Sequence, residues 1–462
     1  MTKLLSFLII FCSLSLCAQV TIKGISNHAF SKFEIGTKAD YISNENIIYG
    51  ETLSDSMGRF SFSFSLEKTE KLFIRHQNKF GYLYAQPKAT YYIEFSDLAF
   101  SNFNQDNEVE LTFINLDTLD INFKILTFEH WLDQSLNILY PLKEKNSGEF
   151  LREIKKFRSA VNEIYSQEKS IFFNDYVKYS LGIHIEELQD FASPSDIDKF
   201  SFYLQETPVK WNNDKYFGFA AIFYDKYFYR QTPEKRLELI HLLDQGNVSS
   251  TLKILESDSL IRSVELSEVV CLLMVTDLYY DRVITKTNLL YFLNQFKLMK
   301  RESVAKRAAE RLFSKFNVLD AGDKLSEYAF ENIKFKDFSS QPIYIQFFNP
   351  TNKKCISELA AMRKLEKTYG KYIKFITIYK EQELYSKSEK TYLDQINWTK
   401  IAAKNNHPIW KDLDVQGFPY YVYVLPNLII GNINALSPSP NGRYETIEKT
   451  LFEYKRMVEG DE

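Results

Sequence analysis

Cysteine is scarce in this sequence. Its 462 residues include 4 cysteines, and two of these, Cys12 and Cys17, lie in an apolar N-terminal run. Only Cys271 and Cys355 then remain for the folded chain. Two thiols are too few for a framework of disulfides, even in an oxidising compartment.

Histidine is equally scarce, which argues against a metal site. There are 6 histidines, and His130, His184 and His241 each stand alone. The nearest cluster is Glu186-Glu187 beside His184, which a solvated helix face explains better than a set of ligands, because no second histidine or cysteine pair accompanies it. Gly-rich phosphate loops, Gly-x-Ser-x-Gly and His-Glu-x-x-His are also missing. We therefore expect no metal and no cofactor.

The sequence has no excess of one charge, but it is rich in aromatic residues. Its 57 basic and 60 acidic residues give no electrostatic case for binding nucleic acid. The 38 Phe and 30 Tyr are spread through the chain, which favours bulky core packing. Stacking of carbohydrate on the aromatic N-terminal domain is kept as a weaker hypothesis.

Long apolar runs are missing except at the start. Residues 1–18 are typical of a secretory signal, with Lys3 before the apolar run Leu4–Leu16 and small residues around Ala18. A lipid anchor on Cys17 is possible but not favoured, because Leu16 is larger than the small residue that such sites prefer. No later run is long enough to span a bilayer. We expect secretion to the periplasm or cell envelope, with no transmembrane span in the mature chain.

Residues 19–97 predict an all-β sandwich domain. Val20–Ile25 alternates between apolar and polar residues. In Asp55–Phe64 an Asp/Ser/Gly turn precedes a strictly alternating strand with one aromatic face. Several short strands separated by turn signals are typical of a small sandwich.

Residues 98–318 predict a connector followed by an all-α block. Residues 98–120 are polar and ambiguous, whereas Phe150–Ile164 has helical spacing. Thr232-Pro233 and Ser195-Asp196 are typical helix starts. Cys271, within an apolar helix, is interpreted as a small core residue.

Residues 319–459 predict an α/β domain with the order β-α-β-α-β-β-α. The segments that carry this order are Pro342–Phe348, Cys355–Tyr369, Tyr372–Tyr379, Leu384–Lys404 (interrupted near Asn397), Pro419–Leu425, Leu428–Ile430 and Tyr444–Met457. In the first helix Cys355, Leu359, Met362, Leu365 and Tyr369 fall on one face, and Gly370 ends it. In the last helix Ile447, Leu451 and Tyr454 are expected to share a face, with Met457 as a further candidate.

This last domain resembles the thioredoxin-like superfamily, in its extracytoplasmic thiol–disulfide oxidoreductase branch. The resemblance rests on Phe347-Phe348, on Cys355 with Glu358 after it, and on Val415–Pro419. The whole chain is similar to secreted multidomain thioredoxin-like proteins of Gram-negative bacteria. The resemblance implies an attacking cysteine at the first helical turn, a resolving cysteine three residues later, and a cis-proline facing them.

The motif is degenerate here, because Asn352 stands at the attacking position and Cys355 at the resolving one. Asn keeps a helix cap and removes the nucleophile. A shielded thiol is a poor nucleophile, so we expect Cys355 to be structural rather than reactive. Pro419 matches the cis-proline, and Asn352, Phe418 and Pro419 are the candidate binding groove. His407 lies in the loop before that strand, and its approach to Cys355 is left open.

Two functions follow. The first is a secreted, non-catalytic thioredoxin-like protein that binds an unknown protein or peptide partner or supports envelope assembly. The alternative is a residual thiol–disulfide oxidoreductase that uses Cys355 alone as its catalytic residue.

Overall fold

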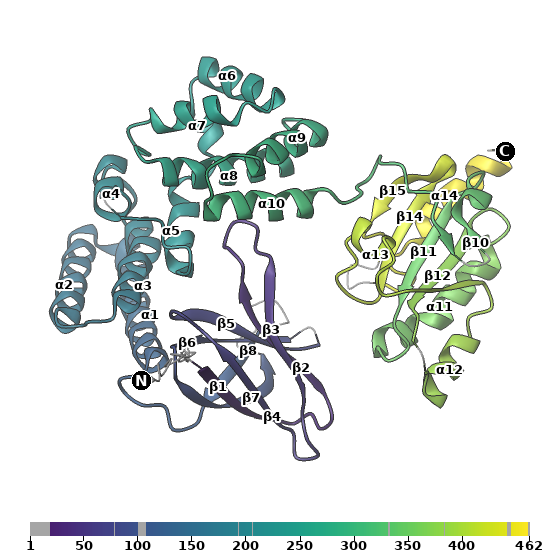
Figure 1. Ribbon diagram of the computed structural model, residues 1–462, viewed down its shortest axis with the longest axis horizontal. Coiled ribbons are helices and arrows are strands. Elements are labelled where there is room, and N and C mark those ends of the chain that lie inside the picture. Colours follow the sequence, from purple (N-terminus) through teal and green to yellow (C-terminus); the bar gives the residue numbers. More distant parts are fainter. Residues whose placement is uncertain are drawn as a thin grey trace, which may run out of the picture. The chain divides into compact units, whose positions relative to one another are not determined.

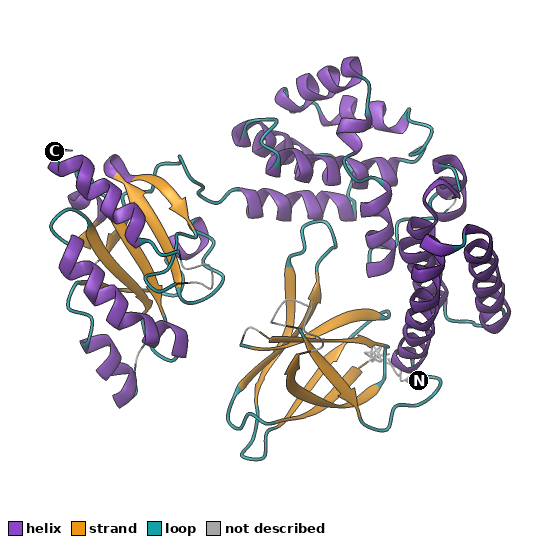
Figure 2. Cartoon of the chain, turned by 180° about the vertical axis from the view of Figure 1, so that it is seen from behind, coloured by secondary structure: helices purple, strands orange, loops and turns teal. Residues whose placement is uncertain are grey.

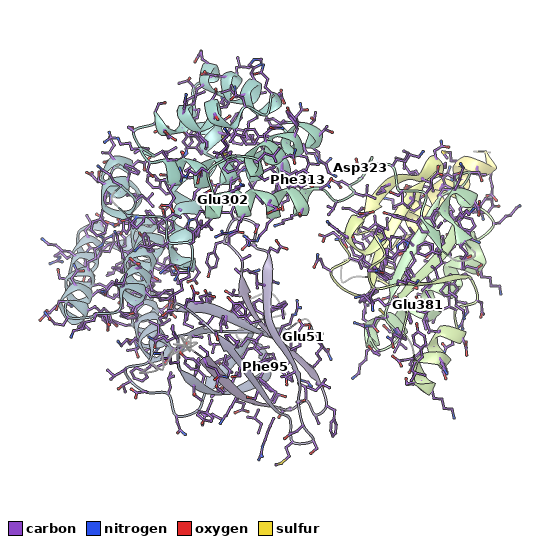
Figure 3. All side chains as sticks on the ribbon, viewed as in Figure 1. Glu51, Phe95, Glu302, Phe313, Asp323 and Glu381 are labelled. Atoms are coloured by element: carbon purple, nitrogen blue, oxygen red, sulfur yellow. The ribbon has the colours of Figure 1, made fainter. Side chains whose placement is uncertain are left out.

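The computed structural model describes residues 19–460, except 78, 100–107, 193, 206, 331–332, 383 and 441–444. The predicted signal, with Cys17, lies outside the described residues. The chain divides into two compact units, and the boundary along the sequence lies between Phe313 and Ser314. Phe313 is labelled at the end of the first unit and Asp323 near the start of the second (Figure 3). The bounds of the four predicted segments, 1–18, 19–97, 98–318 and 319–459, stay predictions.

The N-terminal part of the first unit consists of two four-stranded sheets packed face to face (Figure 1). Their strand orders are β4-β1-β7-β8 and β3-β2-β5-β6. The strands are β1 (Gln19–Ser26), β2 (Lys32–Lys38), β3 (Asn46–Leu53), β4 (Arg59–Ser65), β5 (Glu70–His76), β6 (Lys79–Ala85), β7 (Thr90–Ala99) and β8 (Val109–Phe113).

The alternation seen in the sequence builds the core between these sheets. Phe60 and Phe62 of β4 point inward, and the Phe60 ring stacks on Phe33 at 4.2 Å. Strand β8 lies in the segment predicted to be a connector, so that interpretation of 98–120 is wrong for this part. Val109 and Leu111 of β8 are buried in the same core. Their burial explains why this part of an otherwise polar segment pairs with β7.

Helices make up the rest of the first unit (Figure 2). They are α1 (Ile121–Lys145), α2 (Ser147–Tyr165), α3 (Ile171–Leu181), α4 (Asp196–Tyr203), α5 (Asp214–Phe223), α6 (Pro233–Asp244), α7 (Val248–Glu256), α8 (Val264–Tyr280), α9 (Lys286–Lys297) and α10 (Val304–Phe316). Thr232 and Ser195 cap α6 and α4 as predicted. Cys271 is fully buried in α8, in agreement with its interpretation as a core residue.

One interpretation in this region is wrong. Glu186 does not lie on a solvated helix face, because it is only 2% exposed. Its carboxylate accepts hydrogen bonds from the Arg158 guanidinium and, at 2.9 Å, from the Tyr203 hydroxyl. A buried carboxylate needs such partners, and they come from helices that are distant in sequence.

The sheets and the helices of the first unit are joined by buried polar contacts. Lys71 of β5 pairs with Asp214 of α5 at 2.9 Å, and the Tyr84 hydroxyl donates to the same carboxylate at 2.9 Å. Arg311 of α10 pairs with the fully buried Asp40 at 3.2 Å. These contacts explain why the sheets and helices form one compact unit.

The second unit contains a mixed sheet with the order β13-β12-β11-β14-β15. Strand β11 runs parallel to β12 and antiparallel to β14, and β12 is parallel to β13. The strands of the second unit are β9 (Ala329–Phe330), β10 (Ile333–Lys334), β11 (Ile343–Phe348), β12 (Lys374–Lys380), β13 (Thr399–Ala403), β14 (Tyr420–Leu425) and β15 (Ile429–Ile433). Its helices are α11 (Lys353–Tyr369), α12 (Lys387–Asp394), α13 (Ile409–Asp412) and α14 (Glu448–Glu459). Strands β9 and β10 form a separate hairpin.

Both faces of the five-stranded sheet are buried. Tyr344 and Phe348 of β11 face a core that α11 and α14 complete, whereas Ile345 and Phe347 face a second core with residues such as Phe335. This double burial explains why β11 is apolar on both faces, as parallel strands usually are. The predicted apolar face of α11, from Cys355 to Tyr369, is buried throughout and is confirmed.

Two element predictions in this unit are wrong. The segment Leu384–Lys404, interrupted near Asn397, was predicted to supply the crossover helix, but helix α12 ends at Asp394 and the part after the interruption is strand β13. Ile401 and Ala403 alternate with exposed residues and are buried against β12, which gives this stretch the period of a strand. In α14, Met457 is 69% exposed and does not share the buried face with Leu451.

No helix in the described part of the chain is both long and apolar enough to cross a membrane.

Candidate functional site

The candidate site is built around Asn352, which precedes α11. Its Oδ1 accepts hydrogen bonds from the backbone N–H groups of Lys354 at 2.9 Å and Cys355 at 3.1 Å. The first turn of any helix has N–H groups with no partner inside the helix, and a side chain at this position can satisfy them. Asn352 is therefore a true N-cap, as the sequence predicted.

The other end of the same amide reaches the loop before β14. Asn352 Nδ2 donates to the carbonyl oxygen of Phe418 at 3.1 Å. The Phe418–Pro419 peptide bond is cis, as the resemblance implied. The structure thus brings Asn352 into contact with Phe418, two of the three residues of the predicted groove, and Pro419 follows Phe418 in the chain; the groove itself stays a prediction.

Cys355 lies one turn behind this surface and is fully buried. Its Sγ is 3.5 Å from the backbone N–H of Asn349, and its neighbours in the core are residues such as Phe348 and Tyr421. Burial raises the pKa of the Cys355 thiol to about 11. The thiolate is the nucleophile in thiol chemistry, so a thiol that is both buried and protonated has little reactivity.

A buried carboxylate lies next to this thiol. Glu358 is fully buried, and its Oε1 pairs with the Lys354 ammonium at 2.8 Å. Its Oε2 accepts a hydrogen bond from the backbone N–H of Ser439 at 3.0 Å. The pair ties the first turn of α11 to the segment after β15. Sequence reasoning noticed Glu358 only as part of a resemblance, and the spacing of Lys354 and Glu358 on one helix face was the signal available for the pair.

A row of polar side chains crosses the same face of the sheet, and sequence reasoning missed it. Trp398 Nε1 donates to Thr377 Oγ1 at 2.7 Å, and that hydroxyl donates to Gln346 Oε1 at 3.0 Å. Gln346 Nε2 in turn reaches the Tyr421 hydroxyl at 3.5 Å. Gln346 is directly opposite Thr377 on one side and Tyr421 on the other. The polar residues Gln346 and Thr377 inside otherwise apolar strands were the signal that could have revealed this row.

His407 does not join Cys355. Its ring stacks on Phe330 at 4.5 Å and contacts the edge of Tyr328 at 5.5 Å. Both aromatic residues belong to the core on the opposite face of the sheet from Cys355. Burial lowers the pKa of the His407 imidazole. A Cys–His nucleophile is therefore not assembled in this structure.

Residues that could bind a metal are not clustered. Within the described residues, no group of three or more His, Cys, Asp or Glu side chains has the arrangement that a metal ion needs. The geometry around Asn352 can accept and donate hydrogen bonds, but it presents no nucleophile at the start of α11.

Comparison with known proteins finds matches among solved structures alone. No protein-family model and no curated protein matches the chain. A thioredoxin-like protein from Bacteroides caccae matches with a TM-score of 0.30 and 12% identity, over 52% of this chain and 92% of its own. The thioredoxin domain of a thiol-disulfide oxidoreductase from Bacteroides vulgatus matches with a TM-score of 0.24 and 16% identity, over 29% of this chain and 99% of its own. A thiol:disulfide interchange protein from a Bacteroides species matches with a TM-score of 0.26 and 11% identity, over 32% of this chain and 94% of its own. These values do not assign the chain to a family.

Proposed function

We propose that this chain is a secreted thioredoxin-like protein of the cell envelope that binds a protein or peptide partner and does not catalyse thiol–disulfide exchange. One observation carries the proposal: the side chain of Asn352 fills the position of an attacking thiol with a satisfied hydrogen-bonding group. The helix start keeps its geometry, and the chemistry that a thiolate would supply there is lost.

The state of Cys355 supports the same proposal. A lone cysteine could still exchange disulfides if its thiolate were exposed. Cys355 is fully buried, and burial raises its pKa to about 11. Neither property suits a single-cysteine oxidoreductase, so the alternative function gains no support from the geometry.

The proposed groove consists of the start of α11 and the loop at Phe418-Pro419. The backbone carbonyl of Phe418 already accepts the Asn352 amide. A partner that paired with this loop as an added strand would have to share that carbonyl or displace the amide. We therefore place recognition on the exposed side chains around Thr351 and Lys353, which flank the cap.

The test is reduction of insulin disulfides by dithiothreitol, with a protein that starts at residue 19. The wild type is expected to give no rate above the uncatalysed background. Asn352→Cys is expected to give a rate, because it places a thiol where two backbone N–H groups lower a thiol's pKa, three residues before Cys355. Asn352→Ser is the matched control, since it keeps a cap and adds no thiol.

Each outcome bears on the proposal. A wild-type rate that Cys355→Ala abolishes would replace it with the residual oxidoreductase. Another outcome is that Asn352→Cys folds, forms a disulfide with Cys355 and still shows no activity. In that case the loss of the attacking thiol does not explain the lack of catalysis, and this part of the proposal is wrong.

A further inference from the structure

A cavity in the helical part of the first unit has no role in the proposed function. It has a volume of about 360 Å³, and it lies between α2, α3 and α4. Its lining includes Arg158, Asn162 and Tyr165 from α2, Lys178 from α3, and Phe202 and Tyr203 from α4. Pockets of this size hold small organic molecules.

The Lys178 ammonium is the unusual group in this cavity. It lies over the rings of Phe202 at 4.9 Å, Tyr179 at 5.5 Å and Tyr203 at 5.8 Å. Its nearest acidic neighbour on α3, Asp175, is paired with Lys210 at 3.0 Å. Across the described part of the chain, no carboxylate forms an ion pair with Lys178. Burial lowers the pKa of this half-buried ammonium, and the nearby Asp175 carboxylate offsets only part of that effect.

The acidic groups around the cavity are already neutralised. Glu168 pairs with Lys124 at 2.8 Å, and it also accepts the backbone N–H of Ser170 at 2.7 Å. Glu186 accepts hydrogen bonds from Arg158 and from the Tyr203 hydroxyl. Both of these carboxylates have other cations as partners, so Asp175 is the acidic group left to act on the Lys178 charge, and it does so without an ion pair.

Other polar groups of the lining also lack partners. Arg158 Nε is buried and makes no hydrogen bond with any described residue. The amide of Asn162 and the hydroxyl of Tyr165 belong to the lining, and no hydrogen bond to either side chain is found in the described ranges. The buried Arg158 Nε is a group that a ligand can satisfy, whereas the exposed Asn162 amide would exchange water for the ligand.

We propose that this cavity binds a small organic anion, a carboxylate carried on a flat apolar body. The carboxylate would pair with Lys178, and the flat body would lie against the rings of Phe202 and Tyr203. Phe202 is 63% exposed although it is a large apolar side chain, so a flat ligand would cover apolar surface that water now contacts. Asn162 and Tyr165 would supply hydrogen bonds that orient the ligand.

The test uses matched pairs of probes that differ in charge alone: benzoate with benzamide, phenylacetate with phenylacetamide, and indole-3-acetate with its amide. Binding to a protein that starts at residue 19 is measured by ligand-observed NMR. We expect at least one of the anions to bind with a dissociation constant on the order of 1 mM, as small ligands of this size do, and its amide to bind at least about tenfold more weakly.

Two lysine variants identify the site. Lys178→Met keeps the apolar stem and removes the charge, and it is expected to weaken anion binding at least about tenfold. Lys215→Met is the matched control, because Lys215 also lies over a tyrosine, Tyr176 at 5.0 Å, but is paired with Glu129 at 3.1 Å. It is expected to leave anion binding unchanged. Far-UV circular dichroism and the melting temperature establish that both variants fold.

The result that supports the proposal is anion binding that needs Lys178, with Lys178→Arg retaining it. Wild-type protein that binds none of the three anions would overturn the proposal, as would equal binding of anions and amides. Binding that survives in folded Lys178→Met would also overturn it. None of these outcomes depends on the insulin assay, so the two proposals fail separately.

Discussion

The side-chain amide of Asn352 connects the start of α11 to the carbonyl oxygen of Phe418, at 3.1 Å. The same side chain caps α11 through the N–H groups of Lys354 and Cys355. One residue thus holds the helix start against the loop before β14. An attacking cysteine at this position could not do so, because a thiol has a single weak donor and a weak acceptor.

Asn352→Ala should destabilise the second unit locally. It removes the cap and the link to Phe418, and loss of a cap alone lowers the free energy of unfolding by about 1 kcal/mol. Hydrogen exchange followed by NMR or mass spectrometry is the suitable measurement. The backbone amides of Lys354 and Cys355 should exchange faster, since Asn352 Oδ1 accepts both of them.

Asn352→Asp separates the two contacts of this side chain. A carboxylate keeps the acceptor for the first turn of α11 and suits the positive end of a helix. It cannot donate to Phe418, whose carbonyl would face a negative charge. We expect the amides of Lys354 and Cys355 to stay protected in Asn352→Asp, while the unit is still less stable than the wild type. Equal protection in Asn352→Ala and the wild type would contradict the capping role.

Cys355 should resist thiol reagents in the native state. With a pKa raised to about 11, only about a thousandth of this thiol is ionised near pH 8. The sign of the shift means that the thiolate fraction, and with it the labelling rate, should still be rising at about pH 10. Labelling of Cys271→Ala with Ellman's reagent isolates Cys355, and denaturation in guanidinium should release a full equivalent of thiol. Rapid stoichiometric labelling of the native variant would contradict burial of this group.

The polar row across the sheet gives a prediction about stability. Thr377→Val has nearly the same shape but takes away the hydroxyl between Trp398 and Gln346. Trp398 Nε1 and Gln346 Oε1 then stay buried without this partner, which should lower the free energy of unfolding by about 1–3 kcal/mol. Hydrogen exchange of the β11 and β12 amides reports this loss separately from the first unit.

Thr368→Val is the control for that substitution. Thr368 is exposed on α11, and its hydroxyl bonds only to the carbonyl of Lys364 within the same helix. The same chemical change should therefore alter stability by less than about 0.5 kcal/mol. Similar effects of the two substitutions would mean that the buried row contributes nothing specific.

Much of the second unit could be predicted because its local signals agree. In α11 the cap at Asn352, the buried face that begins at Cys355 and the C-terminal Gly370 all indicate the same helix, and all three are observed. In the first unit, the alternation at Phe60 and Phe62 also has only one period that fits it. Where the cap, the apolar period and the turn residues all indicate the same element, tertiary contacts stabilise the structure that the local sequence already favours.

The failures lie where tertiary contacts decide. Strand β13 has only Ile401 and Ala403 on its buried face, too few for the sequence to separate a strand from the end of a helix. Glu186 resembles any surface glutamate until Arg158 and Tyr203 reach it from other helices. Such partners are far away in sequence, so no local pattern indicates them.

The partly buried pair Lys71–Asp214 predicts how acid acts on the first unit. Burial alone would raise the pKa of the Asp214 carboxyl, but the Lys71 ammonium more than offsets this, with help from Lys215 and Tyr84, and holds that pKa below its usual value. Because this pKa is lowered in the folded state, the pair stabilises the protein at pH values above the ordinary pKa of an aspartate. This stability is lost as the pH falls through the pKa of the folded state. In Lys71→Met the partly buried carboxylate loses its main cation, which should lower the free energy of unfolding at neutral pH by about 1–3 kcal/mol. The pKa of Asp214 should then rise, so the variant should lose less stability on acidification than the wild type, or gain some as Asp214 takes up a proton.

Urea unfolding of both proteins between about pH 4 and pH 7 measures this, and Lys71→Met/Asp214→Leu, in which no charge is buried, should recover part of the loss. A pH dependence identical to that of the wild type would mean that the pair does not set the stability of this unit.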